Sequence, residues 1–131
     1  MGKDFRILAV IPARGGSKGL PGKNIRPFVG LPLVAHSILF ARMCPEIDRC
    51  IVSTDSSDIA RVTRDFSAEV PFSRPPELSG DDTPLWPVLR HALSAIEEQE
   101  KSSYDALLLL DPTSPGRWPA DLIAMRDRLQ E

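Results

Sequence analysis

Residues 5–24 read FRILAVIPARGGSKGLPGKN, and this stretch decides the fold. Residues 5–11 are apolar apart from Arg6 and too few for a helix, which is typical of a central strand in a parallel sheet. The following loop, residues 12–24, is rich in glycine and positive charge, so backbone N–H groups and cations can both reach an anion. The stretch therefore predicts a first strand that leads into a phosphate-binding loop at the carboxyl edge of a parallel sheet.

The loop does not follow two common phosphate-binding motifs. A Walker A loop has four residues between its glycines and then Lys followed by Ser or Thr, whereas Gly16 and Gly22 are separated by five and Lys23 is followed by Asn. The even spacing of Gly16, Gly19 and Gly22 also departs from the dinucleotide fingerprint. A P-loop ATPase is therefore disfavoured, and Pro21 would also prevent a helix from starting cleanly there. A basic surface loop without a ligand is the alternative interpretation of this composition.

Length and composition indicate one globular domain over residues 1–131. The net charge of −2 gives no general positive field, so we do not expect a nucleic-acid partner. No apolar run reaches the length of a membrane-spanning helix, and Cys44 and Cys50 lack the spacing of a zinc site or a disulfide framework. These features predict a cytoplasmic protein with no membrane partner.

Helical and strand patterns alternate after the loop. Pro32 and Pro84 are suitable first helical residues, with Thr83 as a cap, and Pro71 places the third strand near an edge because proline donates no ladder hydrogen bond. Such alternation predicts an α/β fold, mostly a parallel sheet with helices on both faces. We expect helices at 32–42, 58–66, 85–100 and from 119 onward, and strands at 49–53, 68–72 and 106–110.

Unusual polar segments follow each expected strand. They are the glycine loop, Asp55 within VSTD, the segment RPPELSGDDT at 74–83, and the segment DPTSPGR at 111–117. Because parallel strands place their carboxyl ends at one edge, these segments can converge on a single site. Asp55 has two interpretations, as a cap of the next helix or as a wall of that site.

These four segments together resemble the acylneuraminate cytidylyltransferase family, which makes CMP-activated sialic acids and related nonulosonic acids. The quoted motifs are IPARGGSKGLPGKN at 11–24, VSTD at 52–55, RPPELSGDDT at 74–83 and LLLDPTSPGR at 108–117. The resemblance implies a Rossmann-like nucleotide-binding domain of the nucleotide-diphospho-sugar transferase type. It also implies transfer of CMP from CTP to the anomeric hydroxyl of a nonulosonic acid, with release of pyrophosphate and with Mg²⁺ as cofactor.

The resemblance assigns roles to particular positions. Lys23 and Arg14 match catalytic positions, and Arg74 matches an arginine on the nucleotide side of the pocket, although an ion pair with Glu77 is its alternative role. No position is assigned to the metal. The expected nucleotide-binding residues are Arg14, Gly15, Gly16, Ser17, Lys23, Asn24 and Arg74, and the expected substrate-binding residues are Asp111, Thr113 and Ser114.

Two departures from the family pattern limit what the resemblance implies. Asp111 stands where the family has a glutamine that faces the sugar, and a carboxylate there would repel the carboxylate of the substrate unless a cation or a proton intervenes. Asp111 is also a candidate general base by its chemistry and position alone. Family members continue beyond this chain into a region that supplies metal-binding carboxylates and the dimer interface. Without that region, a monomer and a homodimer unlike that of the family are both possible. A truncated or inactive homologue that binds a cytidine nucleotide without turnover is the alternative function.

Overall fold

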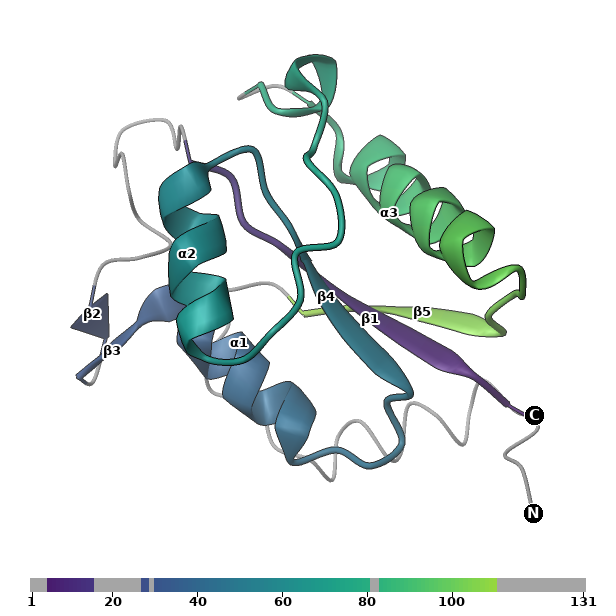
Figure 1. Cartoon of the computed structure of the whole chain (residues 1–131), viewed down its shortest axis with the longest axis horizontal. Helices are drawn as coiled ribbons and strands as arrows, with labels where there is room; N and C mark the ends of the chain where they lie inside the picture. Colours follow the sequence, from purple (N-terminus) through teal and green to yellow (C-terminus); the bar gives the residue numbers. More distant parts are fainter. Residues whose placement is uncertain (1–4, 16–26, 29, 81–82, 111–131) are drawn as a thin grey trace.

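A computed structural model describes residues 5–15, 27–28, 30–80 and 83–110 of the chain. The side chains of Pro27, Phe28 and Leu33 are outside this description. Within it the chain forms a parallel sheet with helices on both faces, as the sequence predicts (Figure 1).

The sheet is built around β1 (Ile7–Pro12), which pairs with β4 (Arg49–Ser53) on one side and β5 (Ala106–Leu109) on the other. Both pairings are parallel, with Ile11 opposite Val52 and Ile7 opposite Ala106. Every residue from Ile7 to Ile11 is at most 1% exposed. The first strand predicted at 5–11 is therefore confirmed as a central strand, shifted in its bounds, and the strand predicted at 49–53 has the predicted bounds.

The strand predicted at 68–72 is reduced to one bridge. Glu69 lies beside Ile51 in the parallel sense, and its carbonyl accepts a hydrogen bond from the Val52 amide at 2.9 Å. The prediction of an edge position was right and that of a strand was wrong, because Pro71 has no N–H with which to extend the ladder. The order across the sheet is thus Glu69, β4, β1, β5, and the chain changes direction across the sheet between β1 and β5.

Among the described residues, three helices cover the sheet, and the helix predicted from 119 onward lies outside them. The helices α1 (Leu33–Arg42) and α2 (Ser57–Asp65) pack on one face, against Ile7, Ala9 and Ile11, while α3 (Leu85–Glu100) packs on the other, against Leu8 and Val10 (Figure 1). The alternation follows from strand geometry, because successive side chains of β1 point to opposite faces. Two apolar clusters result, one on each side of the sheet.

The two prolines that were expected to open α1 and α3 lie just before these helices. Pro32 and Pro84 occupy the N-cap position rather than the first helical position, and neither cap has a side-chain hydrogen bond. The hydroxyl of Thr83, predicted as the cap of α3, accepts instead from the Gly80 amide at 3.1 Å. Pro87 lies in the first turn of α3, where its missing N–H would have no helical acceptor.

Two short elements were not predicted. The strands β2 (Pro27–Phe28) and β3 (Leu31–Pro32) form an antiparallel pair that precedes α1, and Gly30 between them has a φ of 81°, which favours glycine. A single 3₁₀ turn, Pro76–Leu78, lies between the bridge residue Glu69 and α3. Within the described residues no helix has the length and apolar character needed to cross a bilayer.

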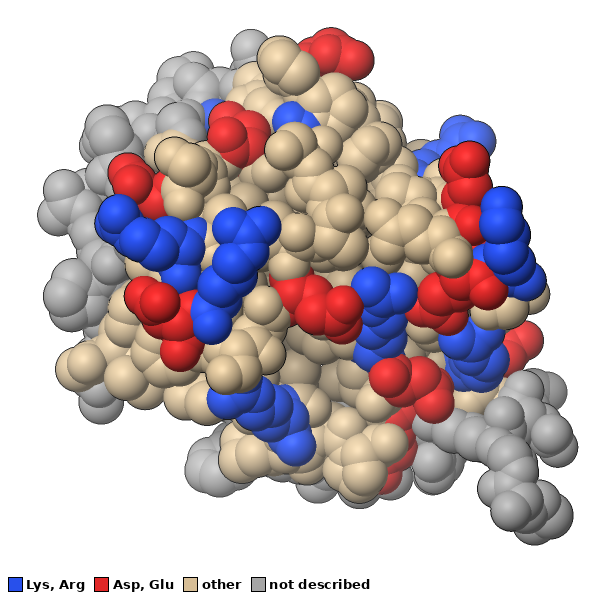
Figure 2. All heavy atoms as spheres, in the orientation of Figure 1, with Lys and Arg blue, Asp and Glu red and all other residues tan. Residues whose placement is uncertain are grey.

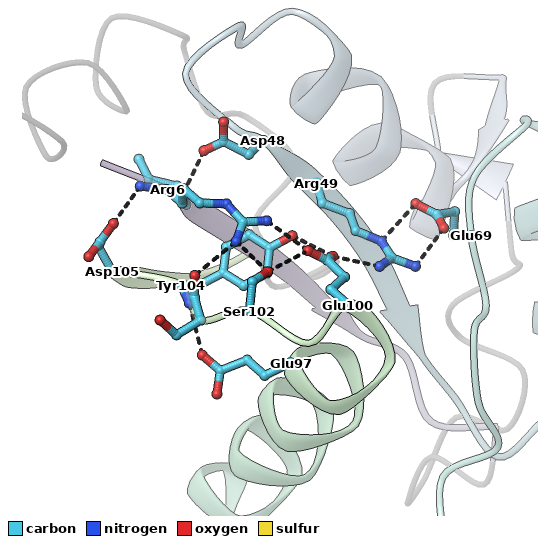
Figure 3. Close-up of polar contacts among 11 residues, drawn as sticks. Arg6, Asp48, Arg49, Glu69, Glu97, Glu100, Ser102, Tyr104 and Asp105 are labelled. Carbon is cyan, nitrogen blue, oxygen red and sulfur yellow. Dashed lines mark hydrogen bonds and ion pairs between the residues drawn. The ribbon is translucent and has the colours of Figure 1, made fainter. Parts of the chain in front are cut away.

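A polar cluster lies at the amino edge of the sheet, centred on the last residue of α3 (Figure 3). Glu100 accepts hydrogen bonds at 2.7 Å from Arg6, Arg49 and the hydroxyl of Tyr104, and Arg49 also pairs with Glu69. We call Arg6, Arg49, Glu69, Glu100 and Tyr104 the Glu100 cluster. It connects α3 to the start of β1 and of β4, at the edge opposite to the predicted site.

Hydrogen bonding and burial shift the pKa values of Glu100 and Tyr104 in this cluster. The Tyr104 hydroxyl, followed by the two guanidinium groups, lowers the pKa of Glu100 to about 2. Burial and the bond to the Glu100 carboxylate together raise the pKa of Tyr104 to about 12. The folded state therefore favours the ionised form of Glu100 and the neutral form of Tyr104.

Candidate functional site

The candidate site lies at the carboxyl ends of β1 and β4. The residues that follow β1, the turn at 53–56 that follows β4, and the segment at 74–85 that leads into α3 meet there. Two backbone bonds join them, from the Ala13 amide to the Ser53 carbonyl at 2.9 Å and from the Arg74 amide to the Thr54 carbonyl at 3.1 Å. The described parts of three of the four loops thus meet at this edge, as predicted, while the rest of the glycine loop and the fourth loop, at 111–117, lie outside the described residues.

Gly15 brings the glycine loop against the turn at 53–56. Its amide donates to Oδ1 of Asp55 at 3.0 Å, and a Cβ at this position would lie 2.7 Å from the Cβ of Ser56. Glycine is therefore required for close packing here, independently of any ligand. Since its amide is bonded to Asp55, the predicted contact between Gly15 and a nucleotide would have to involve other atoms or replace this bond.

Arg74 is a buried cation, 6% exposed, at the centre of the site. Its Nε donates to the hydroxyl of Ser53 at 3.1 Å, and its Nη2 donates to the Ser53 carbonyl at 2.6 Å. Nη1 lies 3.4 Å from the Leu78 carbonyl. The alternative role for Arg74, an ion pair with Glu77, is not formed.

Burial is the main influence on the charge of Arg74. It lowers the pKa of the guanidinium, while Asp55 raises that pKa and Arg14 lowers it further. Arginine stays protonated in spite of such shifts. The opposing effects of Asp55 and Arg14 indicate that all three charges lie close enough to interact.

A cavity of about 240 Å³ is lined by Arg14 and Arg74, the two predicted site cations that the structure describes. Arg14 and Arg74 contribute the positive charge, and Leu85 and Val88 of α3 contribute an apolar wall. Such a lining suits a ligand with one anionic part and one flat apolar part. The remaining lining residues are Pro12, Gly80 and Thr83.

A larger hollow of about 400 Å³ lies beside the first, between α2 and residues 70–73. Asp55 and Arg64 line it, and of the residues that the structure describes neither Arg14 nor Arg74 does. We place the candidate site in the smaller cavity because Arg14 and Arg74 line it together, opposite apolar residues of α3. On the face shown in Figure 2, positive and negative side chains of the described residues are interspersed, in keeping with the small net charge. The presence of Arg14 and Arg74 in one cavity is therefore a local concentration of positive charge.

The structure changes the interpretation of Asp55. The N-cap of α2 is Ser56, whose hydroxyl accepts from the Ile59 amide at 3.2 Å, so Asp55 does not cap the helix. The remaining predicted site residues lie outside the described part of the chain and stay predictions. They are Gly16, Ser17, Lys23, Asn24, Asp111, Thr113 and Ser114.

Sequence reasoning did not assign Ser53 and Thr54, which the structure shows to be buried polar residues that orient Arg74. A signal for them existed, because polar residues at the end of a buried apolar strand need partners that the strand itself does not supply. Among the described residues, no group of three or more His, Cys, Asp or Glu side chains is placed to hold a metal ion.

Comparison with known proteins agrees with this arrangement. A family model described as cytidylyltransferase matches residues 8–100, a range that includes β1, the turn at 53–56, Arg74 and α3. The match confirms the resemblance to cytidylyltransferases that the sequence motifs predicted.

Several relatives are named for nonulosonic acids. CMP-N,N'-diacetyllegionaminic acid synthase of Legionella pneumophila is 44% identical over 115 residues, which are 88% of this chain and 49% of that protein. Pseudaminic acid cytidylyltransferase of Campylobacter jejuni is 37% identical over 111 residues, 85% of this chain and 47% of that protein. N-acylneuraminate cytidylyltransferase of Escherichia coli is 37% identical over 112 residues, 86% of this chain and 25% of that protein. The chain thus spans about half the length of these relatives, or less.

Solved structures share the fold. A CMP:2-keto-3-deoxy-manno-octonic acid synthetase complexed with CTP superposes with a TM-score of 0.69 at 28% identity, over 93% of this chain and 48% of that chain. A 4-diphosphocytidyl-2C-methyl-D-erythritol synthase superposes with a TM-score of 0.74 at 13% identity, over 97% of this chain and 55% of that chain, a likeness of fold alone.

Proposed function

This chain belongs to the cytidylyltransferase family, and on that premise we propose that it supplies the CTP-binding part of an enzyme that transfers CMP from CTP to the anomeric hydroxyl of a nonulosonic acid, releasing pyrophosphate. The observation that carries the proposal is the cavity at the carboxyl edge of the sheet, where Arg14 and Arg74 meet next to an apolar wall. In an open α/β sheet, ligands bind at this edge where the strand order changes direction.

The two arginines suit the chemistry of phosphoryl transfer. Negative charge builds on the departing pyrophosphate, and fixed cations in a site that excludes water stabilise that charge most strongly. Arg74 is hydrogen-bonded to a hydroxyl and to carbonyl groups, so its orientation is fixed before a ligand arrives. We propose Arg14 and Lys23 as catalytic residues, with Lys23 assigned by sequence alone.

Mg²⁺ is part of the proposal, although the described residues provide no cluster of ligands for it. Mg²⁺ commonly binds through substrate phosphates together with one or two carboxylates, so it would arrive with the triphosphate. When bound, it would offset negative charge on the phosphates. The ligands that the protein itself would supply are left unassigned.

A nonulosonic acid is proposed as the acceptor because the relatives are named for legionaminic, pseudaminic and N-acylneuraminic acids. Asp111, Thr113 and Ser114 are the proposed acceptor contacts. A cytoplasmic location, a single domain over residues 1–131 and a homodimer belong to the same proposal.

A cytidine-nucleotide binding protein without turnover is the second candidate. It rests on the same cavity, because cations beside an apolar wall bind a nucleotide whether or not the nucleotide is turned over. Binding and turnover therefore have to be measured separately.

The test uses the purified chain with Mg²⁺ and has two stages. Titration calorimetry with CTP, UTP, ATP and GTP is expected to show preference for CTP, and the preference should be lost in Arg74→Ala but kept in Arg61→Ala, a matched change on the exposed side of α2. Pyrophosphate release is then followed with legionaminic, pseudaminic and N-acetylneuraminic acids. Release with one acid supports the transferase, CTP binding without release supports the second candidate, and no CTP preference contradicts both.

A further inference from the structure

The turn at 53–56 contacts both cationic segments of the candidate site. The Ser53 carbonyl accepts from the Ala13 amide and from Nη2 of Arg74, at 2.9 and 2.6 Å. Oδ1 of Asp55 accepts from the Gly15 amide at 3.0 Å. Arg14 thus lies between two backbone amides that this one turn holds.

Asp55 is an unexpected residue at this place. It is exposed, it does not cap α2, and it lines the larger hollow, while its Oδ1 accepts a hydrogen bond from the amide of Gly15, next to Arg14 in the cavity that the proposed function assigns to a triphosphate. By charge alone, a carboxylate here would weaken the binding of an anion. A carboxylate this close to the charges of Arg74 and Arg14 therefore calls for a contribution that offsets this repulsion.

We propose that Asp55 is a positioning residue for the nucleotide site: its carboxylate fixes the start of the glycine loop through the Gly15 amide, so that Arg14 faces the cavity that Arg74 lines. The inference rests on the proposed function, because it names a determinant of the same site. Asp55 acts through its hydrogen bond to Gly15 and need not touch the nucleotide.

The proposal separates geometry from charge. Asparagine keeps an oxygen at the position of Oδ1 and removes the charge, whereas glutamate keeps the charge and moves the oxygen by one methylene. If the hydrogen bond to Gly15 is what matters, Asp55→Asn keeps nucleotide affinity and Asp55→Glu loses it. If the charge matters instead, Asp55→Glu keeps nucleotide affinity and Asp55→Asn changes it, to weaker binding if the charge orients the arginines or to tighter binding if the charge repels the nucleotide.

The experiment measures the affinity of the chain for CTP and for inorganic tripolyphosphate, each with Mg²⁺, in Asp55→Asn, Asp55→Glu and Asp55→Ala. We expect Asp55→Ala and Asp55→Glu to bind both ligands about tenfold more weakly, the effect of one lost hydrogen bond to a charged acceptor, and Asp55→Asn to stay within about threefold of the unaltered chain. Asp58→Ala and Asp58→Asn are the matched controls, since Asp58 is exposed in the first turn of α2 and does not line the cavity.

Hydrogen exchange of the Gly15 amide, measured without nucleotide, gives a second readout. Exchange is expected to be faster in Asp55→Ala and Asp55→Glu than in Asp55→Asn and in both Asp58 variants. Unchanged affinity in all three Asp55 variants, tighter binding in Asp55→Asn, or a loss in Asp55→Asn equal to that in Asp55→Ala would each overturn the proposal. If the unaltered chain binds no CTP, the proposed function fails instead, and the exchange rates still report whether Asp55 holds Gly15.

Discussion

At the scale of single residues, Arg74 shows how the site keeps a buried positive charge available. Its hydrogen bonds go to the hydroxyl and carbonyl of Ser53 and to the Leu78 carbonyl, and none goes to a carboxylate. Burying a guanidinium without hydrogen-bond acceptors would cost folding free energy. Pairing it directly with a carboxylate would remove that cost but would also weaken its attraction for an anionic ligand. The neutral acceptors therefore hold the guanidinium in place and leave its charge for a ligand.

Replacing Ser53 with alanine tests this arrangement. The change leaves Nε of Arg74 without its acceptor in a buried position, so the free energy of unfolding should fall by about 1–3 kcal/mol, and CTP affinity should fall with it. Urea unfolding and calorimetry measure the two effects. Ser57→Ala, at the exposed first residue of α2, is the control and should change neither. Full CTP affinity in Ser53→Ala would show that the hydroxyl does not orient Arg74.

Replacing Gly15 with alanine tests the close contact between the glycine loop and α2. The added methyl group would lie 2.7 Å from the Cβ of Ser56, so the backbone must shift, at a cost of about 1–3 kcal/mol in the free energy of unfolding. Adding Ser56→Gly should recover part of this loss, since it removes the clashing atom and glycine is an acceptable N-cap.

Gly80→Ala is the control for that prediction, because among the described residues a Cβ there would meet the Thr83 hydroxyl at an ordinary 3.5 Å. Thermal unfolding of these three variants and the unaltered chain gives the comparison. Equal loss at Gly15 and Gly80 would argue against the contact with Ser56.

Sequence motifs identified some of the site residues but not the partners that hold them. Arg14 and Arg74 were selected by their place in the motifs, and the structure brings both to one cavity. The acceptors of Arg74 were not foreseen, because Ser53 is 21 residues away in the sequence. In addition, one of the two oxygens of Ser53 that accept from Arg74 is a backbone carbonyl, which the sequence does not mark. The contact of Gly15 with a nucleotide stays a prediction from its motif. Its close packing against Ser56 is a separate requirement that only the fold reveals.

At the scale of elements, the long periodic segments were predictable and the short ones were not. The bounds of β4 and α3 agree with the prediction because an apolar run and a helical period each mark them along their whole length. The pair β2 and β3 has two residues in each strand, too few for any period. The prediction at 68–72 failed because an apolar pattern does not report whether the backbone can donate to a ladder.

The Glu100 cluster makes the attachment of α3 dependent on pH. The pKa of Glu100 is lowered from about 4.5 to about 2, so its contribution to stability is present above pH 4.5 and is lost as the pH falls towards 2. In Glu100→Gln, the fall in stability between pH 4.5 and 2 should be shallower than in the unaltered chain, and stability at pH 7 should be lower.

Urea unfolding over this pH range measures the effect. Glu98→Gln, a change at an exposed residue of the same helix, should leave the acid dependence unaltered. The same acid dependence in Glu100→Gln as in the unaltered chain would mean that the cluster does not contribute through Glu100. The Glu100 cluster and the candidate site lie at opposite edges of the sheet, so CTP affinity at neutral pH should change little in either variant.

At the scale of the whole molecule, the sheet order explains why the candidate site lies where it does. The chain moves from β1 outward to β4 and Glu69, and it then returns to add β5 on the other side of β1. The strand order therefore reverses at β1, and such a switch point is where open α/β sheets bind their ligands. The sequence allowed this order to be anticipated only in part, because alternation of strands and helices predicts a parallel sheet but not which strand is central.

The most direct test of the account is to locate bound CTP on the chain. Amide chemical shifts recorded by NMR during titration with CTP and Mg²⁺ should change at Gly15, Asp55, Arg74 and Thr83, and they should stay constant at Arg6, Glu100 and Tyr104 in the Glu100 cluster. Shift changes centred on the amino edge, or equal changes with UTP and ATP at every one of these positions, would contradict the claim that Arg14 and Arg74 form a CTP site at the carboxyl edge of the sheet.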